Sequence, residues 1–169
     1  MLQQVSLPSN IRGALFLSPM PGKYESLEQS LQGIREQGVA RIIRLASLDE
    51  IRQDSPHYHR ALEESKIPWP VEDCDVPNYG IPEDESAFLK TVRRAADWLR
   101  MGKRVLVHCG AGIGRTGMFA ICALIALGMS PEAAERTVRE AGSHPEKDVQ
   151  CAFIRRVSAG LQSQRKPLS

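Results

Sequence analysis

One segment of nine residues combines a nucleophile with groups that bind an anion. It reads His108-Cys109-Gly110-Ala111-Gly112-Ile113-Gly114-Arg115-Thr116. Its three glycines permit a tight turn whose amides converge on one anion. The guanidinium of Arg115 can grip two phosphate oxygens, and the positive surroundings favour the thiolate of Cys109, which is the nucleophilic form. The predicted phosphate-binding residues are Gly110, Ala111, Gly112, Ile113, Gly114 and Arg115.

The elements on either side of this loop would position it. Residues 104–107 form a compact apolar run typical of a buried strand, and residues 116–127 are largely apolar and helical in pattern. A helix starting here adds the positive end of its dipole to the anion site. A nucleotide-binding loop would need a lysine where Arg115 stands. The site is therefore expected at the carboxyl end of the strand, where ligands bind in open α/β sheets.

Strand and helix patterns alternate along the rest of the chain. Further strands are expected at 14–17, 40–45 and 67–71, the last at a sheet edge because of its prolines. Further helices are expected at 26–38, 58–65, 82–102, 131–140 and 146–160. This alternation predicts a single α/β domain over residues 1–169, with a mostly parallel central sheet of four to five strands and helices on both faces. The core should span about residues 11–157, and residues 162–169 should form a frayed tail.

The composition argues against several classes of protein. The 169 residues are 42% hydrophobic and 25% charged, as in ordinary soluble domains, and the formal net charge of +2 gives no support to a nucleic-acid binder. No apolar run approaches the ~18 residues that span a membrane, and residues 1–10 do not resemble a secretory signal. The four cysteines show no metal-ligand spacing, so we expect free thiols and a cytoplasmic location, with export without a cleaved signal left open.

The pattern His-Cys, five residues, Arg-Thr is the signature of the cysteine-based protein tyrosine phosphatases, and the chain resembles their dual-specificity branch. Further matching segments resemble the kinase-associated phosphatase group and its bacterial relatives over about residues 11–157. These segments are Leu15-Phe16-Leu17-Ser18 followed by Pro21-Gly22, Gly38-Val39 before a strand, and Leu106-Val107-His108-Cys109. The resemblance implies hydrolysis of phosphate monoesters through a phosphocysteine intermediate, with no metal or other cofactor. It also implies a phosphorylated protein as the substrate, with phosphotyrosine foremost and phosphoserine or phosphothreonine besides, and a monomer is expected.

The resemblance also implies a role for each loop residue. Cys109 would be the nucleophile, and Arg115 would bind phosphate and stabilise the transition state. Thr116 would assist breakdown of the intermediate, and His108 would order the loop and help to maintain the thiolate. No position between Cys109 and Arg115 is basic, whereas relatives that act on inositol lipids tend to carry lysines there. A silent phosphate-binding module, and a phosphatase for a lipid, a nucleotide or an RNA end, are the alternatives.

The general acid has two possible registers in the polar loop at 72–84. The family's acid is an aspartate with one proline three residues before it and another four residues after it. Asp73 has Pro70 and Pro77 at these positions, while the segment 78–82 also resembles the family loop, with Asn78 in place of the aspartate. Because asparagine cannot deliver a proton, Asp73 is the preferred acid and Asp75 is its main rival. The register with Asn78 in the acid position stays open.

Two other polar residues have a possible role at the predicted site. Cys74 lies beside the acid candidates and could form a disulfide with an oxidised Cys109, although an ordinary loop thiol is the preferred interpretation. Gln150 compares loosely with a glutamine that related phosphatases use to position water, and a solvent-facing side chain is the preferred interpretation there.

Overall fold

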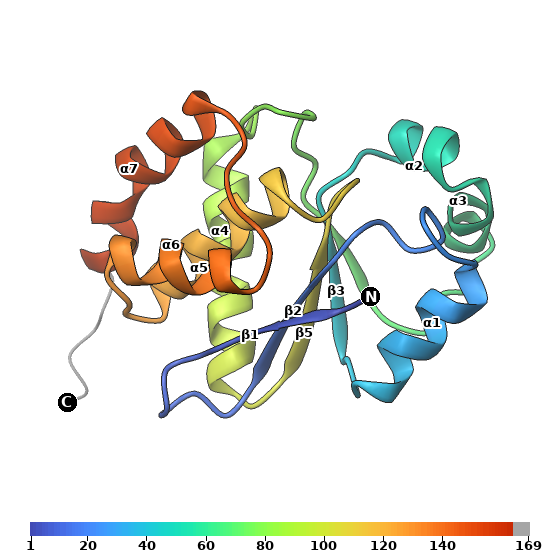
Figure 1. Cartoon of the computed structure of the whole chain (residues 1–169), viewed down its shortest axis with the longest axis horizontal. Helices are drawn as coiled ribbons and strands as arrows, with labels where there is room; N and C mark the ends of the chain where they lie inside the picture. The colour runs from blue at the N-terminus through green and yellow to red at the C-terminus, as the bar shows by residue number, and fades with distance from the viewer. Residues whose placement is uncertain (164–169) are drawn as a thin grey trace.

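Five strands form one sheet that is parallel except at one edge. The computed structural model describes residues 1–163 of the chain. Its strands are β1 (Gln3–Val5), β2 (Ala14–Ser18), β3 (Arg41–Arg44), β4 (Val71–Asp73) and β5 (Arg104–His108). They lie in the order β1-β2-β5-β3-β4, with β1 antiparallel to β2 and every other pair parallel (Figure 1). The mostly parallel α/β sheet predicted from the sequence is therefore confirmed.

The strand predictions differ from the structure at the two edges of the sheet. β1 was not predicted, because three residues of which two are exposed carry no readable alternation. The edge strand predicted at 67–71 begins only at Val71, after the prolines, and continues to Asp73. This shift moves Asp73 from the predicted loop to the end of a strand.

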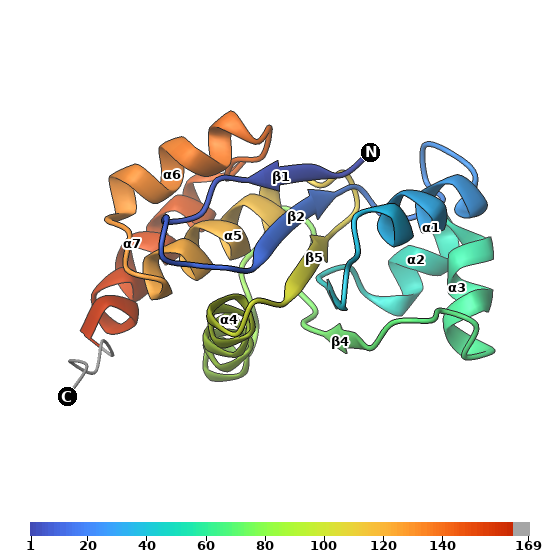
Figure 2. The same cartoon turned by 90° about the horizontal axis from the view of Figure 1, so that it is seen from below.

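The helices cover both faces of the sheet, as predicted. Within residues 1–163 they are α1 (Leu27–Glu36), α2 (Leu48–Asp54), α3 (Pro56–Glu63), α4 (Glu85–Arg100), α5 (Gly114–Ala126), α6 (Pro131–Glu140) and α7 (Asp148–Ser163). α1, α2 and α3 lie on one side and α4 to α7 on the other (Figures 1 and 2). None of these helices has the length and apolar character needed to cross a bilayer. Gln162 and Ser163, expected in the tail, belong to α7, and residues 164–169 lie outside the described residues.

Alternation along the central strands divides the core between the two faces. Leu15 and Val107 belong to the larger core cluster, with side chains of α4, α5 and α7, whereas Phe16 and Leu106 pack on the other face with Ile34 of α1. Every residue of α5 is buried, which explains why its sequence is apolar on all sides. The loop between β5 and α5 is thus held between a central strand and a fully buried helix.

Candidate active site

The loop at 109–113 is held in a tight turn at the carboxyl end of β5. The N–H of Gly112 donates to Sγ of Cys109 at 3.3 Å, and Cys109 is only 2% exposed. Gly112 has φ of +79°, and a Cβ there would lie 2.6 Å from the carbonyl carbon of Ser18. Only glycine meets both conditions. The predicted nucleophile therefore lies buried at the base of the turn, with an amide directed at its sulfur.

Arg115 is buried and is held in one orientation by a carboxylate from α2. Its Nη1 and Nη2 donate to the two carboxylate oxygens of Glu50 at 2.8 and 2.7 Å, and Nη1 also donates to the carbonyl of Val76 at 3.1 Å. A guanidinium has five N–H groups, so Nε–H and one N–H of Nη2, on one edge, have no hydrogen-bond partner among residues 1–163. Two parallel donors of this kind fit two oxygens of a phosphate.

The charges around Arg115 keep it protonated despite its burial. Burial by itself lowers the pKa of Arg115, but the hydrogen bonds to Glu50 and the negative charges of Cys109, Glu50 and Glu146 outweigh it, and the pKa is raised. Glu50 was missed in the sequence because its short helix follows no motif. The acidic residues after Ser47, which caps α2, are the local signal that could have shown the helix.

His108 is a fully buried neutral residue that ties the loop to α3. Its Nδ1 lies 3.2 Å from the carbonyl oxygen of Cys109, which can only accept, so Nδ1 carries the proton. Nε2 then accepts from the hydroxyl of Tyr58 at 2.9 Å. Burial lowers the pKa of His108 to about 4 and raises that of Tyr58, so both groups keep these roles at neutral pH. His108 thus links the loop to α3, and Tyr58 is a partner that the sequence did not reveal.

Thr116 follows Arg115 in the first turn of α5. Its hydroxyl is buried and has no hydrogen-bond partner within the described residues. A buried hydroxyl that lacks a partner costs about 1–3 kcal/mol.

The two acid candidates are brought together by a buried arginine of β3. Arg44 is 2% exposed, and its guanidinium pairs with Asp73 at 2.5 Å and with Asp75 at 2.8 Å. Residues 74 and 76 continue the pairing with β3. Because side chains alternate along a strand, those of 73 and 75 lie on the face opposite to those of 74 and 76. Asp73 lines a groove with Arg44 and Trp69. Within residues 1–163 neither carboxylate forms a hydrogen bond or an ion pair with Cys109 or Arg115. The assignment of the acid stays a prediction.

The third candidate position, Asn78, lies on the exposed loop that follows β4. This loop is linked to the start of α7 by Gln150, whose Nε2 donates to the carbonyl of Gly80 at 3.1 Å. Gln150 is completely buried, so the expectation of a solvent-facing glutamine was wrong.

Burial raises the pKa of the Cys74 thiol to about 12, which leaves that thiol protonated at neutral pH.

Two charged side chains from distant segments lie at the loop between Cys109 and Arg115, which is called the phosphate loop below. Nζ of Lys23 is 3.6 Å from the place that a Cβ on Gly110 would take, and it pairs with Asp54 at 2.8 Å. The carboxylate of Glu146 lies against Gly114, 3.1 Å from Cδ to the corresponding Cβ position. Neither residue stands near the loop in sequence, and no motif pointed to them.

Curated proteins match parts of this chain. Human tyrosine-protein phosphatase non-receptor type 14 is 31% identical over 78 residues, which are 40% of this chain and 7% of that protein. Putative tyrosine phosphatase 067L of Invertebrate iridescent virus 3 is 31% identical over 112 residues, which are 66% of this chain and 44% of that protein. The matched part therefore spans less than half the length of these relatives.

Solved structures share the whole fold at low identity. Kinase associated phosphatase, with serine in place of its catalytic cysteine, superposes with a TM-score of 0.81 at 18% identity and covers 97% of both chains. PTPMT1 gives a TM-score of 0.73 at 19% identity, covering 97% of this chain and 98% of that one. PTPMT1 has also been solved in complex with PI(5)P, with a TM-score of 0.71 at 20% identity over 90% of this chain and 94% of that one.

A family model spans most of the chain. The model described as "Swiss Army Knife protein, DSP-PTPase phosphatase domain" matches residues 23–166, a range that includes the whole phosphate loop. The resemblance read from the sequence to the dual-specificity phosphatases is thereby confirmed. The chain belongs to the family of Swiss Army Knife proteins with a DSP-PTPase phosphatase domain.

Proposed function

We propose that this protein hydrolyses phosphate monoesters through a phosphocysteine intermediate on Cys109, without a metal, and that phosphotyrosine in proteins is its main substrate. One observation carries the proposal. A buried cysteine sulfur receives the Gly112 amide at 3.3 Å, while Arg115, fixed by Glu50, keeps one edge with two donors available. This arrangement has the parts that a covalent phosphoryl transfer needs, namely a nucleophile and donors for the phosphate oxygens.

The reaction takes two steps in this proposal. The thiolate of Cys109 attacks phosphorus, the S–P bond forms, and the P–O ester bond breaks with its electron pair passing to the leaving oxygen, which takes a proton. Water then attacks phosphorus and gives up a proton, which balances the one taken in the first step, the S–P bond breaks, and its electron pair returns to sulfur. The amides of the loop and the available edge of Arg115 stabilise the charge on the three other oxygens. Thr116, the next residue after Arg115, offers a buried hydroxyl that has no partner among residues 1–163.

The charges at the mouth of the loop support a singly phosphorylated substrate. No position between Cys109 and Arg115 is basic, and the ammonium of Lys23, which lies near Gly110, is paired with Asp54. Two carboxylates, Glu50 and Glu146, also lie at the loop. A highly charged inositol headgroup would meet little positive charge here, which favours phosphopeptides.

Turnover of 4-nitrophenyl phosphate by wild type, Cys109→Ser and Arg115→Ala tests the proposal. Wild type should turn over and both variants should lose activity, while orthovanadate should compete with the substrate and a chelator should change nothing. Equal and negligible turnover by wild type and Cys109→Ser would establish a silent phosphate-binding module instead. A dependence on added divalent metal would refute the mechanism.

A panel of phosphate monoesters tests the substrate class. It should include phosphotyrosine and phosphothreonine peptides, a phosphoinositide in vesicles, a nucleoside monophosphate and an RNA with a terminal phosphate. The highest kcat/KM is expected for a phosphotyrosine peptide. A phosphoinositide or a nucleic acid end turned over much faster than every peptide would overturn the assignment.

A further inference from the structure

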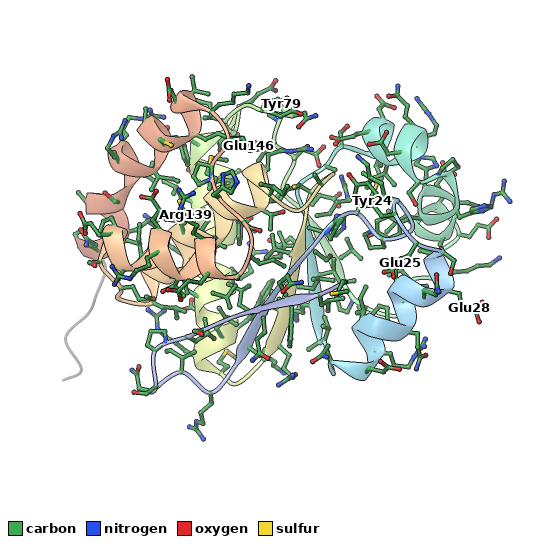
Figure 3. The ribbon with its side chains drawn as sticks, in the orientation of Figure 1. Tyr24, Glu25, Glu28, Tyr79, Arg139 and Glu146 are labelled. Carbon is green, nitrogen blue, oxygen red and sulfur yellow. The ribbon has the colours of Figure 1, made fainter. Side chains whose placement is uncertain are left out.

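A carboxylate that the mechanism above leaves unused lies against the phosphate loop. Glu146 belongs to the segment between α6 and α7, and a Cβ placed on Gly114 would overlap its Oε2. Gly114 begins α5 and directly precedes Arg115, whose pKa the negative charge of Glu146 helps to raise. Figure 3 shows Glu146 at the end of the molecule where α5 begins, with Tyr79 at the same end. The carboxylate is therefore at the anion site, although it is distant from the loop in sequence.

The fold holds this segment firmly in place. The N–H of His144 donates to the carbonyl of Ile113 at 3.2 Å, and the backbone of His144 lies so close to α5 that a Cβ on Gly117 would be 2.7 Å from its nitrogen. The buried side chain of Gln150 accepts from the N–H of Glu146 at 2.8 Å. The backbone that carries the carboxylate is thus fixed to the phosphate loop on one side and to α7 on the other.

Gln150 also brings the loop after β4 to this place. Its Nε2 donates to the carbonyl of Gly80, and Nζ of Lys147 lies 5.1 Å from the ring centre of Tyr79. The segment of Glu146 and the loop that carries Asn78 are therefore joined through the side chain of Gln150. Of the two side chains, only that of Glu146 can exchange a proton.

A negative charge beside a site for a dianion has an electrostatic cost that calls for a reason. Glu146 makes no ion pair with any residue of 1–163, so it is not a structural salt bridge. The other carboxylates near the active site are engaged, since Glu50 is bound to Arg115 while Asp73 and Asp75 are bound to Arg44. Protonating any of these three would cost an ion pair. Glu146 is the carboxylate at the loop that can gain or lose a proton without breaking one.

We propose that Glu146, and not Asp73 or Asp75, is the general acid and general base of the reaction, an inference that rests on the proposed phosphatase function. In the first step the protonated carboxyl of Glu146 gives its proton to the leaving oxygen as the P–O bond breaks. In the second step the resulting carboxylate takes a proton from the water that attacks phosphorus. The S–P bond breaks, phosphate leaves, and the thiolate of Cys109 and the protonated Glu146 are both restored.

The test compares two substrates that differ in their need for an acid. Phenyl phosphate has a basic leaving group that must be protonated, whereas 4-nitrophenyl phosphate needs protonation much less. Glu146→Gln should lose about 10²–10⁴-fold in kcat/KM on phenyl phosphate, the usual contribution of general acid catalysis, and much less on 4-nitrophenyl phosphate. The same variant should bind orthovanadate at least as tightly as wild type, because a negative charge has left the anion site.

Three further variants serve as controls and rivals. Asp148→Asn removes an exposed carboxylate two residues after Glu146 and should leave kcat/KM unchanged on both substrates. Asp73→Asn and Asp75→Asn should lower kcat/KM on the two substrates equally or not at all. Asn78→Asp in the Glu146→Gln background should restore part of the phenyl phosphate activity, because it returns a carboxyl group to the facing loop.

The outcomes separate this inference from the function on which it rests. A wild type without turnover on either substrate refutes the phosphatase function, and the role of Glu146 with it. If wild type is active but Glu146→Gln loses kcat/KM equally on both substrates, or loses vanadate binding, then Glu146 has a structural role. That result overturns the inference about Glu146 and leaves the phosphatase function standing. A selective loss on phenyl phosphate in Asp73→Asn or Asp75→Asn assigns the acid there instead.

Discussion

Acidification should destabilise this protein through one buried histidine. His108 is completely buried, and both of its nitrogens are engaged, Nδ1 with the Cys109 carbonyl and Nε2 with the Tyr58 hydroxyl. A second proton on the ring would place a charge in the core beside the guanidinium groups of Arg44 and Arg115. Burial first, and these cations besides, lower the pKa of His108 to about 4.

The direction and size of the effect follow from this pKa. The folded protein binds its proton at His108 near pH 4, while the unfolded chain binds it near the ordinary 6.5. Between these values the unfolded state carries more protons, so stability falls as the pH drops from about 6.5 toward about 4 and changes no further through this group below that. The difference between the two pKa values corresponds to roughly 3 kcal/mol of unfolding free energy.

Urea denaturation at a series of pH values measures this loss. Wild type is compared with His108→Gln, in which the titrating imidazole is absent, so that the difference between the two proteins isolates this group. Wild type should lose more stability than the variant over this pH range, by up to about 3 kcal/mol. Should the variant fail to fold, the ring signals of wild type in an NMR titration give the same answer. Identical pH slopes in the two proteins, or a His108 ring that titrates near 6.5, would refute the reasoning.

Two further substitutions test how the loop is held. Gly112→Ala should destabilise the protein by about 1–3 kcal/mol, measured by chemical denaturation, and abolish orthovanadate binding, because its φ of +79° disfavours a side chain and the new Cβ would overlap the backbone of Ser18 and Pro19. An alanine variant with wild-type stability and vanadate affinity would show that the turn can adjust. Gln150→Met removes three partly buried hydrogen bonds and should cost about 1–3 kcal/mol of stability. It should also lower the activity on phenyl phosphate, because the segment of Glu146 loses its support. Unchanged stability would contradict the bridging role of this side chain.

Much of the fold could be predicted from local patterns. Alternating strands and helices predicted the parallel sheet, and α6 was predicted with the bounds that the structure shows, because a serine cap followed by proline at 131 marks its start. β1 and α2 were missed since each is short and draws its stability from tertiary packing. The start of α4 was also displaced, from Pro82 to Glu85, because Asp84 provides the cap.

The chemistry of the phosphate loop was determined by the sequence itself. A nucleophile, three glycines and an arginine lie within nine consecutive residues, so their types and spacing fix what the turn can bind wherever it is placed. The partners of that loop come from elsewhere in the chain, as Glu50 does from α2, Tyr58 from α3 and Glu146 from the segment before α7. Only the packing of helices on both faces of the sheet brings these side chains to the end of β5.

The acid candidates show the same division most clearly. Proline spacing favoured Asp73, but spacing along the chain does not say toward which face of a strand a side chain points. The pairing of β4 with β3 decided that, and it placed Asp73 and Asp75 on the buried Arg44. A side chain's neighbours depend on strand register and on the packing of distant segments, which a single sequence does not specify.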